Sequence, residues 1–275
     1  TMVGGMEGML REPSGCFEQT SSSNYPNVMV MSYLKENRLA DPRLTARVMG
    51  LMQRGYRKLV GYEVKSRGYE WFGRAPGHEA LTAYGLLEFR DMRQVFPKVS
   101  RTMMDRTAAW LLARRDGKGG FQRNGRALDR FGRASKAVTD GYITYALAEG
   151  GYGARIHREL AAQKRVAQST KDDYLLALAV NSLLSTPKHA AAGRRLAARL
   201  AKRQHKSGAW LQASHSVTRS GGVNLKIETT ALAAMALLKA GGYAAQVRRA
   251  VSWMSKNRNG YGRWGATQAT VLGLK

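Results

Sequence analysis

The stretch "RGYEWFGRAPGHEALTAYGLLEF", Arg67–Phe89, shows the unit on which most of the chain is built. A loop rich in glycine and aromatic residues is followed by a short polar segment and then by an apolar helix. The same order recurs in Gly117–Gly151 and in His205–Gly242, and "RNGYGRWGATQATVLGLK" closes the chain in the same way. Weak repetition at such a period is typical of folds that arrange similar helical units around a common core.

Further helical patterns lie between these loops, with apolar residues three and four positions apart. They cover Leu44–Tyr62, Arg101–Arg114, Asp172–Leu184, Ala190–Lys202 and Tyr243–Lys256. Sustained alternation of apolar and polar residues is missing, so the sequence predicts an all-α fold of about ten to twelve helices. Outer helices that alternate with apolar inner helices resemble an α/α toroid, with concentric inner and outer helices as in terpenoid cyclases. An irregular helical bundle and an open solenoid are the alternatives.

Length and composition fit a packed globular chain. Hydrophobic residues make up 44% and charged residues 23% of 275 residues, which predicts a sizeable core rather than disorder. We expect one domain over residues 1–275. The start "TMVGGMEGML" lacks the features of a signal peptide, and we interpret it as the cut edge of a larger multidomain protein. No apolar run is long enough to span a bilayer.

The charge balance is strongly basic, with 45 Lys and Arg against 19 Asp and Glu and a net charge of +26. This excess favours anionic partners, such as an anionic cell surface, acidic neighbouring domains or nucleic acid. Ordinary solubility explains the same excess. The segment Ala190–Lys206 places arginines at helical spacing, which is typical of a solvated helix face. Because no nucleic-acid-binding motif accompanies the basic residues, we predict no specific DNA or RNA partner.

The chain contains a single cysteine, Cys16, in "REPSGCFEQTSSSNYPN". One cysteine excludes an internal disulfide and a multi-cysteine zinc site. A thiol can condense with the side-chain amide of Gln19, expel ammonia and form an internal thioester, which is a good acyl donor. Gly15 and its neighbours permit a tight turn before the thiol, and Phe17 places a ring beside it. The run "TSSSNYP" then predicts the cap of the next helix, with Pro26 in its first turn.

The segment "PSGCFEQTSSSNYPNVMVMSYL" resembles the thioester segment of the alpha-macroglobulin and complement superfamily, in which Cys-x-Glu-Gln carries the bond. On this resemblance Cys16 and Gln19 form the thioester and Glu18 belongs to the motif. The apolar Phe17 is more similar to bacterial alpha-2-macroglobulins, since animal members generally have glycine there. The resemblance extends over the chain through "WLLARRDGKGGFQRNGRALDRFG" and "NRNGYGRWGATQATVLGLK". It implies the thioester-containing domain, an α-toroid that covalently traps target proteases through their lysine amines after cleavage of a bait segment elsewhere in the parent protein.

The resemblance also implies which nucleophiles the thioester prefers. Some complement members place a histidine in the loop after Gly-x-Phe, where it transfers the acyl group to hydroxyls. Here that position falls on or next to Asp129, and no histidine lies between His78 and His157. We therefore expect direct attack by amines, with Asp129 orienting the lysine ammonium or accepting its proton. Capping or solvation of a loop is the alternative role for Asp129. Such a module reacts once and is not a turnover enzyme.

Other conspicuous residues receive structural interpretations. We expect His78 to cap or pack at a helix start, Asp172 and Asp173 to begin a helix, and Trp71, Trp210 and Trp264 to pack. The remaining histidines are scattered, so we expect neither a metal site nor a cofactor. Two functions compete with trapping: a non-covalent basic binding module or opsonin-like surface tag, and a toroidal terpene cyclase or prenyltransferase, for which "KDDY" is a poor acidic motif. We expect other domains of the parent to shield the thioester, and a periplasmic or secreted location.

Overall fold

The computed structural model describes residues 7–39, 41–125, 133–258 and 267–275. These residues form eleven α-helices and three short helical turns. The helices are α2 (Phe17–Glu36), α3 (Pro42–Val60), α4 (Glu79–Val95), α5 (Arg101–Ala113), α6 (Lys136–Leu147), α7 (His157–Ser169), α8 (Asp173–Leu184), α9 (Ala190–Lys202), α10 (Gly222–Ala240), α11 (Ala244–Lys256) and α12 (Thr267–Leu274). The turns are η1 (Ala148–Tyr152), η2 (Gly153–Arg155) and η3 (Pro187–His189).

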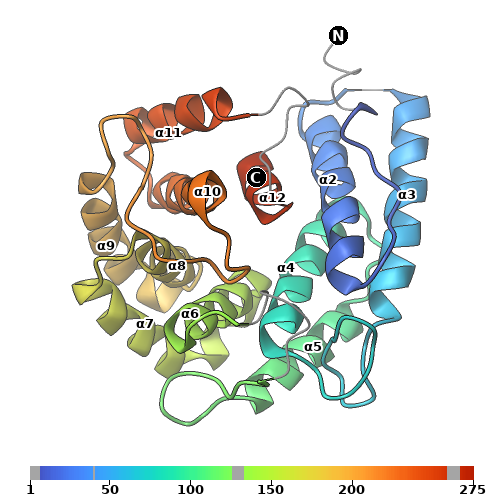
Figure 1. Cartoon of the computed structure of the whole chain (residues 1–275), viewed down its shortest axis with the longest axis horizontal. Coiled ribbons are helices and arrows are strands. Elements are labelled where there is room, and N and C mark those ends of the chain that lie inside the picture. The colour runs from blue at the N-terminus through green and yellow to red at the C-terminus, as the bar shows by residue number, and fades with distance from the viewer. Residues whose placement is uncertain (1–6, 40, 126–132, 259–266) are drawn as a thin grey trace.

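The even-numbered helices form a closed inner ring. Helix α2 contacts α4, and the contacts continue through α6, α8 and α10 to α12, which packs back against α2. The odd-numbered helices α3, α5, α7, α9 and α11 lie outside this ring (Figure 1). The fold is therefore an all-α toroid, as the sequence predicts. Within the described residues there is no strand beyond two isolated bridges, Glu63–Tyr69 and Arg115–Phe121.

The inner and outer helices differ because their sequences bury different amounts of surface. In α8, ten of twelve residues are buried, and α10 is buried continuously from Ile227 to Ala234. In α9, by contrast, the buried residues are Gly193, Leu196, Ala197 and Leu200, which form one stripe. A helix that is apolar all round requires partners on every side, whereas one with a single apolar stripe can face solvent. The sequence thus places each helix in its layer.

Helix starts are defined by short polar side chains. Ser100 and Ser135 accept hydrogen bonds from the backbone N–H groups of Met103 and Val138, and Asp172 accepts from Tyr174 and Leu175. These oxygens satisfy donors that a helix leaves without an internal partner. The prediction that Asp172 and Asp173 begin a helix is confirmed.

The prediction for the start of the first inner helix is wrong. Helix α2 begins at Phe17, directly after Cys16, and Pro26 lies inside it rather than in its first turn. The serine-rich run continues the helix because its hydroxyls donate to backbone carbonyls one turn earlier, as in Ser22 to Glu18 at 2.8 Å and Ser23 to Gln19 at 2.9 Å. Burial of Tyr25, Pro26 and their neighbours in the ring stabilises a helix that this local sequence does not favour.

The recurring loops carry buried tryptophans. Trp71 is 1% exposed and Trp210 is fully buried, with its indole N–H donating to the carbonyl of Leu200 at 2.8 Å. Both confirm the predicted packing role, while Trp264 lies outside the described residues. These rings fix the loops at the ends of the inner helices, and one such loop positions the site described next.

Candidate reactive site at the start of helix α2

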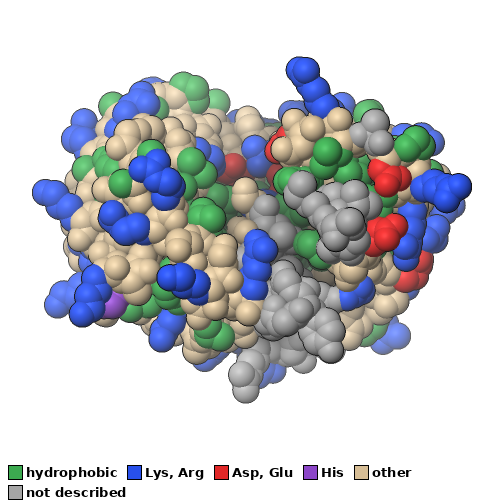
Figure 2. Space-filling view, turned by 90° about the horizontal axis from the view of Figure 1, so that it is seen from above, with side chains coloured by type: hydrophobic (Ala, Val, Ile, Leu, Met, Phe, Trp, Pro, Cys, Tyr) green, Lys and Arg blue, Asp and Glu red, His purple; other side chains and the backbone are tan. Residues whose placement is uncertain are grey.

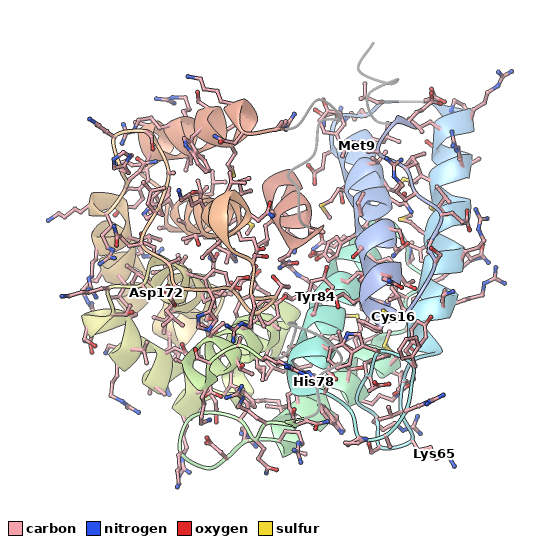
Figure 3. All side chains as sticks on the ribbon, in the orientation of Figure 1. Met9, Cys16, Lys65, His78, Tyr84 and Asp172 are labelled. Atoms are coloured by element: carbon pink, nitrogen blue, oxygen red, sulfur yellow. The ribbon has the colours of Figure 1, made fainter. Side chains whose placement is uncertain are left out.

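The chain reaches Cys16 by running back along α2. Arg11 and Asn27 exchange two hydrogen bonds, from the Arg11 N–H to Asn27 Oδ1 at 3.1 Å and from Asn27 Nδ2 to the Arg11 carbonyl at 2.9 Å. Glu12 binds the Arg54 guanidinium of α3 through both carboxylate oxygens, at 2.6 and 2.8 Å. Figure 3 shows Met9 beside one end of α2 and Cys16 at the other. The segment that carries the thiol is thus tied to two helices.

Gly15 allows the side chain of Gln19 to fold over the helix start. Its φ of +80° lies in the left-handed region, and a Cβ there would stand 2.0 Å from Gln19 Oε1. Any other residue at this position would therefore clash with the Gln19 amide and also strain the backbone. The Ser14 and Gly15 carbonyls accept from the Thr20 hydroxyl at 3.2 and 3.3 Å, which holds the turn against the first turn of α2.

Cys16 and Gln19 meet in a capping box. Cys16 is the N-cap of α2, its side chain lies over the backbone N–H of Gln19, and its own backbone N–H donates to Gln19 Oε1 at 3.1 Å. Cys16 is buried, with 6% of its surface exposed, whereas Gln19 is exposed. The arrangement brings the amide that the sequence analysis selects to the thiol and leaves it open to an incoming reactant.

Phe17 anchors this turn in the core. Its ring is fully buried, 5.3 Å from the ring of Tyr69 and 6.2 Å from that of Tyr62. It lies on Gly85 of α4, where an added Cβ would come within 2.7 Å of Phe17 Cζ. Phe17 therefore fills a defined space between these rings and Gly85, and it fixes the first turn of α2 against the next inner helix, α4.

Trp71 supports the motif from the loop before α4. Its carbonyl accepts from the Phe17 N–H at 2.8 Å, and its indole N–H donates to Glu18 Oε2 at 3.3 Å. Glu18 is half-buried, beside the exposed Gln19. A packing role alone was expected for Trp71 from the sequence, but the residue also orients Glu18, through a contact across 53 positions that no local pattern reveals.

His78 is the N-cap of α4, as predicted. Its Nδ1 accepts from the Leu81 N–H at 3.3 Å, so the neutral ring carries its proton on Nε2. Burial lowers the pKa of His78, which favours this neutral form. The ring packs edge-on against Trp71 with centroids 5.0 Å apart (Figure 3 labels His78). His78 thus supports Trp71, which in turn contacts the motif.

Asp129 lies outside the described residues, so its predicted role is untested. The chain that leads to it is held at the start of α4. The Asn124 N–H donates to Glu79 Oε2 at 2.8 Å, and Asn124 Nδ2 donates to the Gly77 carbonyl at 3.2 Å. Glu79 is itself buried and accepts from the Arg114 guanidinium at 2.8 Å.

Two features of the fold were not expected from the sequence. His157 and His189, which appear scattered, meet with Nδ1 and Nε2 3.1 Å apart. Glu88 and Glu228 lie fully buried in the inner ring, and burial raises the pKa of each to about 7. Groups of three or more potential metal ligands do not occur among the described residues.

A cleft of about 370 Å³ lies away from Cys16, at the opposite end of α2. Glu36 and Met29 of α2 line it, together with ion pairs between Glu149 and Lys239 and between Asp91 and Lys275. Its charged groups already neutralise each other. The cleft is therefore separate from the turn that holds Cys16 and Gln19.

Comparison with known families agrees with this geometry. In the described part of the chain, every helix is too short or too polar to cross a bilayer. The family model of the A-macroglobulin TED domain, the thioester-containing domain, matches residues 1–275, which is the whole chain. The closed ring of inner helices and the motif at the start of α2 thus occur in a sequence that this model covers from end to end, and the chain belongs to the A-macroglobulin TED domain family.

Proposed function

We propose that this domain is the covalent trapping module of an alpha-macroglobulin-like protease inhibitor, in which a Cys16–Gln19 thioester acylates lysine amines. The observation that carries the proposal is the capping box. It places a buried thiol and the exposed residue Gln19 on one helical turn, with the spacing that the resemblance to the family's thioester segment implies. Glu18 completes the motif and is oriented by Trp71.

Formation of the bond needs no cofactor. The Cys16 sulfur attacks Cδ of Gln19, a C–S bond forms, the C–N bond of the amide breaks, and ammonia leaves with the thiol proton. The reaction is favoured by proximity, because the capping box holds both groups in one turn. The buried environment of Cys16 and the ring of Phe17 limit the access of water to the sulfur.

The start of α2 also suits the reverse step, in which an amine attacks Cδ and the thiolate leaves. Negative charge then develops on Gln19 Oε1, which already accepts from the Cys16 N–H at 3.1 Å. A backbone donor at this distance stabilises an oxyanion, and the positive end of the helix dipole stabilises both the oxyanion and the thiolate. The amine proton passes to a nearby base or to the thiolate, and the product is an amide between the target and Gln19.

The choice of nucleophile follows from the residue type at position 129, which is Asp129 in this sequence. We propose that a carboxylate there, in place of histidine, attracts a lysine ammonium and accepts its proton, so amines react in preference to hydroxyls. Each domain reacts once, since the acyl group is its own Gln19. The domain is therefore a single-use reagent rather than an enzyme.

Domains of this family are parts of larger macroglobulin or complement proteins and are typically secreted or extracellular. We place this chain in the periplasm or outside the cell. Neighbouring domains shield the thioester until cleavage of a bait segment exposes it to the attacking protease. The exposed Gln19 of the isolated domain is the surface that such a neighbour covers.

The test is the intact mass of the freshly prepared full-length protein, measured with and without methylamine. An intact thioester makes the protein lighter than its sequence mass by one ammonia, and methylamine adds its whole mass while freeing one titratable thiol. Cys16→Ala and Gln19→Glu serve as controls that cannot show the missing ammonia. A fresh preparation that has the plain sequence mass and ignores methylamine contradicts the proposal.

The second candidate is a non-covalent basic module or surface tag, which the net charge of +26 favours. It differs from trapping in one measurable respect. Capture of a protease that survives Cys16→Ala supports the basic module, whereas capture that is lost together with the thiol supports trapping.

A further inference from the structure

The exposed charges of the molecule are unevenly distributed. The outer layer formed by α7, η3, α9 and α11 carries exposed Lys and Arg but no exposed Asp or Glu among described residues 156–210 and 241–258. We call this surface the basic wall. Its exposed cations are Arg158, Arg165, Lys188, Arg194, Arg195, Lys202, Arg248, Arg249 and Lys256.

The few acids in this part of the chain are already engaged. Glu159 of α7 is 2% exposed, Asp172 caps α8, and Asp173 is buried in an ion pair with Arg203. Elsewhere in the described molecule several cations are paired with acids, as in Glu12–Arg54 and Glu63–Arg106, although the exposed face of α3 also carries cations and no acid of its own. Figure 2 shows the same contrast, with blue side chains spread over the left part and red ones among them on the right.

The wall is a continuous surface because its helices are bonded to each other. The Arg199 guanidinium of α9 donates to the Thr170 carbonyl at 2.8 Å, just after α7 ends. Gln204, just after α9, donates to the Gln246 carbonyl of α11 at 2.8 Å and accepts from the Arg249 guanidinium at 2.7 Å. These bonds therefore tie the three helices to one another.

We propose that the basic wall docks the domain onto a bilayer surface that contains anionic phospholipid. The outer helices α7, α9 and α11 follow one another around one side of the toroid and present a convex face, which differs from the groove that holds a nucleic acid strand (Figure 1). Tyr243 and Trp253 pack against the core, so the wall lacks the stacking platforms of single-strand binders. Each Lys or Arg near such a surface is worth about fivefold in affinity.

The docked domain would keep its reactive end free. Helices α7, α9 and α11 lie on the other side of the ring from α2 and α3, which hold the Cys16 segment (Figures 1 and 3). The lipid contact uses none of the residues of the reactive site. Binding to lipid therefore goes beyond the proposed function, and its test does not depend on whether the thioester forms.

The experiment is sedimentation of the protein with vesicles of phosphatidylcholine alone and with vesicles that also contain phosphatidylglycerol, at low and high salt. We expect binding only to the anionic vesicles, weakened by salt because ions screen these contacts. The test variant carries Arg194→Glu, Arg195→Glu, Lys202→Glu and Arg248→Glu, and its affinity for anionic vesicles should fall at least ~100-fold.

A matched control separates the wall from general basicity. Arg43→Glu, Arg47→Glu, Arg57→Glu and Lys58→Glu change the net charge by the same amount on the exposed face of α3. The affinity of this variant for anionic vesicles should fall by less than about threefold, after subtraction of the loss of general electrostatic attraction. The comparison of low and high salt measures that general loss. Equal losses in the two variants, or tighter binding to a duplex oligonucleotide than to the vesicles, would overturn the proposal. Circular dichroism checks that each variant is folded. If the wall variant with four substitutions does not fold, the variant with only Arg194→Gln and Arg195→Gln takes its place.

Discussion

The inner and outer rings use similar helix lengths for opposite purposes. The inner helices α2, α4, α6, α8, α10 and α12 are packed on several sides and hold buried polar groups such as Glu88 and Glu228. The outer helices α9 and α11 bury a narrow stripe each, and the charged residues that they expose are all cations. The reactive turn belongs to the inner ring, since Cys16 caps α2 and Phe17 rests on α4. The basic wall belongs entirely to the outer ring.

Because of this difference, stability and the reactivity of Cys16 depend on the inner ring, whereas surface charge depends on the outer ring. Substitutions in the inner ring should alter stability and the reactivity of Cys16 together, because the same contacts support both. Substitutions on exposed outer positions should alter charge and binding while the fold stays intact. Three comparisons between the rings test this separation.

Phe17→Ala should have the largest effect. Truncation of a fully buried aromatic ring costs about 3–5 kcal/mol of unfolding free energy. It should also raise the reaction rate of the Cys16 thiol with Ellman's reagent, since the ring no longer fixes the first turn of α2. Chemical denaturation and thiol kinetics on the thioester-free domain measure the two effects.

The outer-ring control for this change is Val251→Ala, at a position that is 50% exposed on α11. Its unfolding free energy should stay within about 0.5 kcal/mol of the parent value and its thiol rate should be unchanged. A Phe17→Ala variant as stable as Val251→Ala would show that the inner ring does not depend on this contact.

Glu228→Gln should change how stability depends on pH. Burial raises the pKa of Glu228 to about 7, and its Oε2 has no hydrogen-bond partner among the described residues. The folded state therefore holds the proton more tightly than the unfolded state, and stability falls as pH rises from about 4.5 to about 7. The glutamine variant avoids this loss, so its advantage should grow between about pH 4.5 and 7, to roughly 3 kcal/mol.

The measurement is urea denaturation of both proteins across this pH range. The difference between the two curves isolates Glu228 from every other titrating group. A difference that does not change with pH would mean that the carboxyl is solvated in the folded state.

A pair of glycines gives the smallest and sharpest comparison. Gly85 lies within inner helix α4, and a Cβ there would come 2.7 Å from Phe17 Cζ, whereas at Gly50 in outer helix α3 it would meet only Arg54 at 3.5 Å. Gly85→Ala should destabilise by about 1–2 kcal/mol through overpacking. Gly50→Ala should stabilise by up to about 1 kcal/mol through helix propensity. Thermal unfolding of the two variants measures both signs, and equal signs would contradict the assignment of the rings.

The parts of the fold that depend on neighbouring residues were predicted from the sequence, and the parts that depend on contacts between distant segments were not. The all-α class and the helices between Leu44 and Lys256 follow from apolar periodicity, which local sequence carries. The start of α2 did not, because Pro26 and the serine run favour a boundary that burial in the ring overrides. Local propensity is a weak determinant when most of a helix is enclosed by others.

The candidate site shows the same division. The spacing of Cys16 and Gln19 predicts chemistry on one helical turn, and the turn is present as a capping box. The contact of Trp71 with Glu18 joins positions 53 apart, and the seat of Phe17 on Gly85 joins two inner helices. Such contacts depend on how the rings pack, which the sequence around the motif does not encode.

The sequence by itself determined the helical class, the excess of positive charge and the residues that we propose form a thioester, because periodicity, composition and spacing are local properties. Only the tertiary structure decided that α12 closes the ring on α2, that Gln19 is exposed while Cys16 is buried, and that the cations of α7, α9 and α11 form one wall. Each of these results depends on contacts between segments far apart in the chain, and such contacts are set by packing of the whole toroid.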